Sequence, residues 1–285
     1  MKSICFFSSY YEHTSIPYYV RCYLTELKKH FTTVVFITNK KEFSITDCDF
    51  LNEQKLEKLS VENEGFDFGM WHKAMQKFDV KTYERLALVN DSCILFKALD
   101  QVFETINKSD WDYCGLLDSN QIEYHLQSYF VVINRNALPI VETYFQQHGL
   151  CENFEDVIKI YEVGLTQHLI KSNLRVGSVF SCKVCGDDLN AAFSGIEALI
   201  KKGFPMIKKK IIFGNYRKGE ARDLSRIDFN FNPNFYVQLI QKTNSNLILD
   251  FKMLREDYNY NVVNFKLKGI VLVSNFINAL KRLIR

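Results

Sequence analysis

The sequence is poor in the two residues that shape tight turns, with 12 glycines and 4 prolines among 285 positions. An all-β sandwich or barrel needs many such turns, so this scarcity argues against that class. No apolar run reaches the roughly 18 residues that a membrane-spanning helix requires. The formal net charge is only +3. Dedicated nucleic-acid-binding proteins carry a larger basic excess, so we expect no nucleic-acid partner.

Signals for export, zinc binding and disulfide bonding are also weak. Residues 1–4 lead directly into an apolar strand pattern, without the organisation of a secretory signal. The chain has eight cysteines, and Cys5, Cys93 and Cys114 lie in or beside apolar runs, where a free thiol packs as a small hydrophobic group. Cys182 and Cys185 form a single C-x-x-C without the second ligand pair of a structural zinc site. We therefore expect a reduced, cytoplasmic protein.

What the sequence does contain is an alternation of buried strands and amphipathic helices over its first 180 residues. Strands are predicted at 4–7, 34–37, 86–89, 113–117, 129–133 and 176–180. One helix is predicted to begin at residue 17, and others at 70–78, 99–106 and 161–174. Strand, helix and strand in fewer than forty residues predict a βαβ unit and a mostly parallel α/β sheet flanked by helices. Ligands of such sheets bind at the carboxyl ends of the strands, so the segments that begin at Ser8 and Asn39 lie on the predicted rim.

The composition changes near residue 205. Residues 1–205 form one predicted α/β domain, and residues 206–285 form a basic, Asn-rich extension that ends in an amphipathic helix near 276–284. Its lysines, Lys208 to Lys210 among them, either face solvent or attract an anionic membrane or a phosphorylated substrate. The terminal helix could lie on the inner face of the plasma membrane, pack on the α/β domain or form a homodimer contact.

Two short segments are candidates for phosphate chemistry. Asn90-Asp91-Ser92 follows a buried strand, where a carboxylate can hold Mg²⁺ or Mn²⁺ while substrate phosphates complete the coordination shell. The same triplet also suits an Asx-turn that ends the strand, and the sequence leaves both interpretations open. In the second segment, Gly65 and Gly69 flank Asp67, which allows a close backbone approach to a ligand. The alternative is a helix-entry turn with Asp67 near the helix N-terminus. Neither segment is a G-x-G-x-x-G or P-loop motif.

Two further segments suggest sugar chemistry. His125, Gln127 and Ser128 can form hydrogen bonds with a hydroxyl-rich ligand, and Trp71 or Tyr129 could stack on a sugar ring. Glu162 lies near the start of the helix predicted at 161–174. There it either interacts with the helix dipole or acts as a general base toward an acceptor hydroxyl.

Taken in order, these segments resemble the rhamnan synthesis protein F family of bacterial glycosyltransferases, which build cell-surface polysaccharides. The resemblance covers about residues 1–210 and depends on Tyr18-Tyr19-x-x-x-Tyr23-Leu24-x-x-Leu27, Glu62-Asn63-x-Gly65-x-Asp67-x-Gly69, Asn90-Asp91-Ser92, Asp112-Tyr113-x-Gly115-Leu116, His125-Leu126-Gln127-Ser128-Tyr129-Phe130 and Tyr161-Glu162-x-x-Leu165.

The resemblance implies a GT-A-like, Rossmann-like glycosyltransferase that moves a sugar from a nucleotide-sugar donor to a glycan acceptor, which could be lipid-linked. Donor contacts are expected at Ser8, Tyr10, Asn39, Asn63, Gly65, Asp67, Gly69, Asn90 and Asp91. Acceptor contacts are expected at His125, Gln127, Ser128 and Trp71. Asp91 is the expected ligand of a divalent cation, Mg²⁺ or Mn²⁺. Glu162 is the expected catalytic base of a single in-line displacement, with Asp118 as the second candidate.

Some features of the sequence keep other functions open. Asn90-Asp91-Ser92 offers one carboxylate where the usual Asp-x-Asp motif offers two, which leaves strict metal dependence undecided. A carbohydrate-binding protein without catalysis, or a non-catalytic subunit of a polysaccharide synthase, would retain several of these segments. A nucleotidyltransferase or phosphotransferase would also place an aspartate at a strand end, with more carboxylates than this sequence offers.

Overall fold

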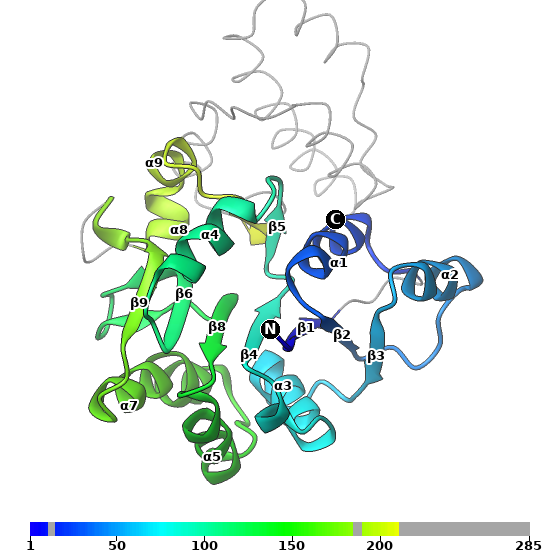
Figure 1. Cartoon of the computed structure of the whole chain (residues 1–285), viewed down its shortest axis with the longest axis horizontal. Helices are drawn as coiled ribbons and strands as arrows, with labels where there is room; N and C mark the ends of the chain where they lie inside the picture. The colour runs from blue at the N-terminus through cyan, green and yellow to red at the C-terminus, as the bar shows by residue number, and fades with distance from the viewer. Residues whose placement is uncertain (11–14, 185–189, 211–285) are drawn as a thin grey trace, which may run out of the picture.

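An eight-stranded mixed sheet forms the centre of the computed structural model, which describes residues 1–10, 15–184 and 190–210. Its strand order is β3-β2-β1-β4-β8-β6-β7, with β9 also paired to β6 (Figure 1). Helices cover both faces, and the predicted mostly parallel α/β sheet flanked by helices is confirmed.

The N-terminal half of the sheet is parallel. β1 (Ser3–Ser9) lies between β2 (Thr33–Thr38) and β4 (Arg85–Asn90), and β3 (Glu57–Ser60) extends the sheet beyond β2. All seven residues of β1 are buried, as expected for a strand that helices cover on both faces. The helices between these strands are α1 (Tyr18–His30), α2 (Ile45–Glu53) and α3 (Phe66–Lys77).

The second half departs from the parallel pattern at two strands, β8 and β7. β8 (Phe130–Asn134) runs antiparallel to both of its neighbours, β4 and β6 (Tyr113–Ser119). The short β7 (His125–Leu126) is antiparallel to β6, whereas β9 (Val176–Phe180) is parallel to β6. Helices α4 (Asp100–Lys108) and α5 (Leu138–His148) follow β5 (Cys93–Leu95) and β8.

Two hydrophobic cores lie on opposite faces of the sheet. Successive side chains of a strand point to opposite faces, so Cys5 and Phe7 of β1 join one core, and Ile4 and Phe6 join the other. The first core contains the apolar faces of α1 and α4. The second contains those of α3, α5 and the helix after residue 153, which Figure 1 shows together on one side.

The helix predicted at 161–174 begins earlier than expected. It starts as α6 (Phe154–Asp156), continues as a π-helix at Val157–Gly164 and ends as α7 (Leu165–Lys171). Asn153 Oδ1 accepts a hydrogen bond of 2.9 Å from the backbone N–H of Asp156 and caps the true N-terminus. Glu162 therefore lies in the interior of a helical run, and the proposed interaction with a helix N-terminus is wrong.

Strand β10 (Met206–Lys208) pairs antiparallel with β5, so ordered structure of the first domain continues past residue 205. The remaining short elements are η1 (Val80–Thr82), η3 (Cys182–Val184), α8 (Ala191–Ser194) and α9 (Ile196–Lys201). Within the described ranges, no helix combines the length and hydropathy needed to cross a bilayer. Cys185 and the amphipathic helix predicted near 276–284 lie outside the described residues, and the domain boundary stays a prediction.

Candidate functional site

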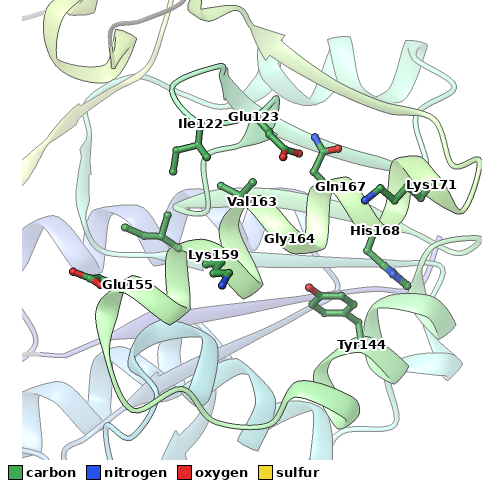
Figure 2. Close-up of a pocket in the computed structure, with 11 residues that line it drawn as sticks. Ile122, Glu123, Tyr144, Glu155, Lys159, Val163, Gly164, Gln167, His168 and Lys171 are labelled. Atoms are coloured by element: carbon green, nitrogen blue, oxygen red, sulfur yellow. The ribbon is translucent and has the colours of Figure 1, made fainter.

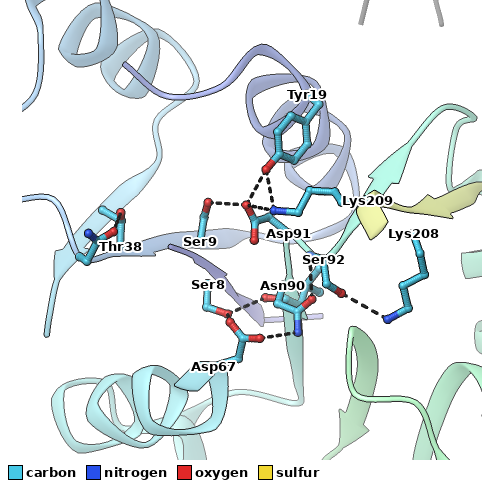
Figure 3. A network of polar contacts seen from close by, with 12 residues as sticks. Ser8, Ser9, Tyr19, Thr38, Asp67, Asn90, Asp91, Ser92, Lys208 and Lys209 are labelled. Carbon is cyan, nitrogen blue, oxygen red and sulfur yellow. Dashed lines mark hydrogen bonds and ion pairs between the residues drawn. The ribbon is translucent and has the colours of Figure 1, made fainter. Parts of the chain in front are cut away.

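Polar side chains from separate segments converge at the carboxyl ends of β1, β2 and β4 (Figure 3). The strand register places Ser8 of β1 beside Asn90 of β4, and Ser9 beside Thr38 of β2. Asp91 follows β4 directly, and its backbone N–H donates to the carbonyl of Ser8 over 3.2 Å. The sheet edge thus forms a polar floor, as the βαβ pattern predicts.

The carboxylate of Asp91 is the most heavily hydrogen-bonded group of this floor. Its Oδ2 accepts from Ser9 Oγ at 2.9 Å, from the Tyr19 hydroxyl at 2.6 Å and from Lys209 Nζ at 2.9 Å. Only 7% of Asp91 is exposed. Burial and the neighbouring Asp91 raise the pKa of Tyr19 well above its usual value, so this hydroxyl remains a donor.

A second carboxylate, that of Asp67, enters the same cluster from the first turn of α3. Oδ1 accepts from Ser8 Oγ at 3.0 Å and Oδ2 accepts from Asn90 Nδ2 at 2.9 Å (Figure 3). Burial of the carboxyl and repulsion from Asp91 raise the pKa of Asp67 to about 6, although Ser8 and two nearby lysines oppose the shift. The two carboxylates of this cluster, Asp67 and Asp91, thus come from segments 24 residues apart rather than from one motif.

The two lysines are the last residue of β10 and the residue after it. The sequence left them either facing solvent or attracting an anionic group, and did not place them beside Asp91. Lys209 Nζ contacts Asp91 and the Tyr19 hydroxyl, each at 2.9 Å. Lys208 Nζ lies 3.4 Å from Ser92 Oγ and 4.0 Å from the centre of the Tyr129 ring. The signal in the sequence was the basic run at 208–210, but nothing local connects that run to Asp91.

The predicted cation site at Asp91 stays a prediction, and an ammonium group already contacts one of its two carboxylate oxygens. All three donors to Asp91 converge on the same oxygen, and one of them already carries a positive charge. Across the described ranges, no group of three or more Asp, Glu, His or Cys side chains is arranged to hold a metal ion. The other oxygen of Asp91, Oδ1, accepts no hydrogen bond among the described contacts, and Mg²⁺ ordinarily binds through one or two carboxylates.

The two glycines before α3 have a local structural role. Gly65 adopts a left-handed conformation with φ of 73° and precedes the first residue of the helix. A Cβ on Gly69 would lie 1.8 Å from the carbonyl oxygen of Glu64, so protein backbone fills the space that we expected a ligand to use. These glycines position Asp67, and their donor contacts stay predictions.

The remaining donor candidates lie at the rim. Asn63 is exposed and Tyr10 is 47% exposed, and Asn39 is half-buried beside Thr38, whose Oγ1 donates to Asn39 Oδ1 over 3.4 Å. Their side chains are available from solvent, and their contact with a donor stays a prediction.

The two candidate bases differ in how their oxygens are used. Glu162 Oε1 accepts from both the backbone N–H and the hydroxyl of Ser128, at 3.2 and 3.1 Å. Asp118, in contrast, has both oxygens engaged: Oδ2 by Ser178 Oγ at 2.9 Å and Oδ1 by the backbone N–H of Cys182 at 2.5 Å. Among the described contacts, Glu162 keeps its second oxygen for a further donor and Asp118 does not. Both catalytic roles stay predictions.

His125 and Gln127 are buried and Ser128 is half-buried, and their contact with an acceptor stays a prediction. Gln127 is 4% exposed and donates from Nε2 to Asn190 Oδ1 over 3.1 Å, and His125 Nδ1 lies 2.8 Å from the carbonyl of Glu123. Trp71 is fully buried in the core beside Phe68, so its predicted stacking on a sugar ring is wrong. An indole enclosed by apolar neighbours has no face left for a ligand.

Tyr129 retains an unsatisfied hydroxyl. Its ring is buried beneath Lys208, and its hydroxyl oxygen has no hydrogen-bond partner among the described residues. Burial, together with Cys93, Glu162 and Asp118, raises the pKa of Tyr129 well above its usual value. Within the described contacts, the ammonium group of Lys208 is the polar group placed over the face of this ring.

An open cavity of about 750 Å³ lies beside the same helical run (Figure 2). Lys159, Gln167 and His168 line it from this run, and Tyr144 of α5 faces them. Glu162 is not part of the lining, since its carboxylate contacts Ser128. A Cβ on Gly164 would lie 2.7 Å from the carbonyl oxygen of Lys159, so the π-helical turn requires this glycine.

Comparison with known sequences places the chain in a family. The sequence profile of the rhamnan synthesis protein F family matches residues 34–267. The chain belongs to this family. A curated relative, virulence protein VirA of Vibrio anguillarum, is 27% identical over 193 residues, which span 55% of this chain and 62% of that protein. The match thus covers less than two thirds of the relative. The family profile confirms the resemblance inferred from the ordered segments.

Solved structures with some similarity include nucleotide-processing enzymes. A protein described as a nucleotide-diphospho-sugar transferase from Desulfovibrio desulfuricans G20 has a TM-score of 0.38 at 12% identity, over 71% of this chain and 88% of its own. The 4-diphosphocytidyl-2C-methyl-D-erythritol synthase of Anaerococcus prevotii has a TM-score of 0.43 at 9% identity, over 63% and 86%. A cytidylyltransferase of Leptospira borgpetersenii has a TM-score of 0.39 at 11% identity, over 88% and 98%.

Proposed function

We propose that this chain is a nucleotide-sugar-dependent glycosyltransferase that extends a bacterial surface polysaccharide. The observation that carries the proposal is the polar floor at the carboxyl ends of β1, β2 and β4, where Asp91 and Asp67 meet two lysines from β10. Membership of a family described by rhamnan synthesis supports the substrate class.

In the proposed reaction, the acceptor hydroxyl attacks the anomeric carbon while the bond to the nucleoside diphosphate breaks. Glu162 takes the hydroxyl proton, because it keeps one carboxylate oxygen for a new donor while Ser128 holds the other. Positive groups at the sheet edge stabilise the charge that develops on the departing diphosphate. A displacement in one step inverts the anomeric configuration.

The first test is a thermal-shift screen of UDP-, dTDP- and GDP-sugars, followed by measurement of slow nucleoside diphosphate release. The proposal expects one nucleotide class to stabilise the wild-type protein. Asp91→Asn should abolish that shift, whereas Asp79→Asn, at an exposed carboxylate beside η1, should retain it. Circular dichroism verifies that both variants fold.

The main alternative is a non-catalytic carbohydrate-binding protein or partner subunit of a polysaccharide synthase. It predicts stabilisation by glycans but by no nucleotide sugar, and no release of nucleoside diphosphate. That combination of results would replace the transferase proposal. The cytoplasmic location, the lipid-linked acceptor and the membrane contact of the C-terminal helix are further predictions, which vesicle co-sedimentation of the full chain addresses.

A further inference from the structure

We propose that the ammonium group of Lys209 takes the place of a divalent cation at Asp91, so that the donor diphosphate binds to this chain without a metal ion. The inference rests on the proposed function, because it concerns how the same site receives a nucleotide sugar. It differs from the sequence-based expectation, in which Asp91 coordinates Mg²⁺ or Mn²⁺.

The first support is the geometry of the Lys209 ion pair. Nζ lies 2.9 Å from Asp91 Oδ2, the side chain of Asp91 is 9% exposed, and that of Lys209 is 28% exposed. The Tyr19 hydroxyl donates to the same carboxylate oxygen and accepts from Lys209, which closes a triangle of three short contacts (Figure 3). Asp91 thus holds a cation that belongs to the chain itself.

The second support is the donor capacity of the lysine. An ammonium group has three N–H donors, and among the described residues Lys209 uses two of them, toward Asp91 and Tyr19. The third can donate to a phosphate oxygen, since the side chain is partly exposed. Asp91 and Tyr19 fix the orientation of the group, so little side-chain entropy is lost when the phosphate binds.

The third support is the backbone pairing that positions both lysines at the site. β10 pairs with β5, which follows Asp91 in the chain, and the backbone N–H of Lys209 donates to the carbonyl of Ser92 over 2.8 Å. Lys208 is directed toward Ser92 and the Tyr129 ring on the other side of this strand pair. Two positive charges therefore flank the end of β4, which is a suitable arrangement for a diphosphate.

The experiment measures binding of UDP, dTDP and GDP, each alone, by isothermal titration calorimetry in excess EDTA and again in excess MgCl2. The proteins are wild type, Lys209→Met and the matched control Lys210→Met, whose side chain is exposed. Wild type should bind one nucleotide in EDTA, and MgCl2 should change the affinity by less than about tenfold. Lys209→Met should weaken binding by roughly 10- to 100-fold, as expected for a lost charge-assisted contact, and Lys210→Met should not.

Three results would overturn the inference. Nucleotide binding that appears only with MgCl2 assigns the site to a metal, and binding that Lys209→Met leaves unchanged assigns Lys209 a structural role. Absence of nucleotide binding in every condition contradicts the proposed function as well as the inference. The first two results contradict the inference alone. If Lys209→Met does not fold, Lys209→Gln replaces it, because the amide keeps N–H donors near Asp91 and Tyr19 but removes the charge. It should show the same loss of affinity in EDTA, and unchanged affinity would contradict the inference.

Discussion

Asn90 Nδ2 donates a hydrogen bond of 2.9 Å to Oδ2 of Asp67, which joins the carboxyl end of β4 to the first turn of α3. Ser8 Oγ makes the equivalent contact from β1 to Oδ1 of the same carboxyl group. Both donors are neutral, and the negative charge of Asp91 acts on the same group from the other side. Asp67 therefore gains hydrogen bonds from the sheet edge but no direct ion pair within the described residues.

This arrangement predicts a pH dependence of stability. The pKa of Asp67 is raised to about 6 in the folded protein, above the ordinary value near 4, so the folded state holds this proton when the unfolded state has lost it. The contribution of Asp67 to stability should fall as the pH rises from about 4 to about 6. Urea unfolding of wild type and Asp67→Asn across this range should give a difference that changes with pH. A constant difference would contradict the shifted pKa.

The base proposed for the transfer step gives a kinetic prediction. Glu162→Gln should lower kcat by about 10²–10⁴-fold with the donor affinity nearly unchanged, because the amide cannot accept the proton. Glu152→Gln, at an exposed glutamate that precedes α6, is the control. If kcat of Glu162→Gln stays within a few-fold of wild type, the base lies elsewhere. Asp118→Asn is then the next variant, judged after its folding is verified.

The salt bridge between Asp112 and Arg175 predicts sensitivity to acid. Asp112 accepts from the backbone N–H and from Nε of Arg175, at 2.9 and 3.1 Å, and these contacts lower its pKa to about 2. The stabilisation is present above pH 4 and should be lost as the pH falls toward 2. Asp112→Asn should destabilise the protein at pH 7, less at pH 3 and least as the pH approaches 2, as measured by urea unfolding. Asp110→Asn, which removes the exposed partner of the same arginine, should have a small effect at both pH values.

The two glycines before α3 should differ in their tolerance of a methyl group. Gly69→Ala places Cβ 1.8 Å from a backbone oxygen that cannot move without shifting the helix entry, so we expect a loss of about 1–3 kcal/mol or more. Gly65→Ala adds strain at φ of 73°, but its nearest contact is 3.2 Å, so its loss should be smaller. Thermal unfolding of the two variants gives the order, and equal or reversed losses would show that the helix entry adapts.

The sequence predicted the strands that are buried on both faces, because β1, β2 and β4 are continuous apolar runs. It missed β5 and β10, since three residues carry too little periodicity to be distinguished from a loop. The start of the helix that contains Glu162 was misplaced because its π-helical turn at 157–164 departs from the spacing of 3.6 residues. Trp71 was misassigned because an aromatic ring in a sequence does not reveal which neighbours enclose it.

The polar floor was predicted in part for a related reason. Ser8, Asn90 and Asp91 follow strands whose parallel order could be inferred, so their edge could be inferred as well. Lys209 lies 118 residues after Asp91 in the chain, and the pairing of β10 with β5 brings the two together. No local sequence pattern predicts that pairing. Long-range pairing of short strands is decided by tertiary packing, and a single sequence contains little information about it.

The separation of Lys209 from Asp91 also has a consequence during protein synthesis. At a ribosomal rate of about 5–20 residues per second, β4 is complete about 6–24 seconds before Lys209 is added to the growing chain. During that interval the nascent sheet edge contains Asp91 without the lysine that later pairs with it. The carboxylate of Asp91 gains this partner only when β10 pairs with β5 and completes the site.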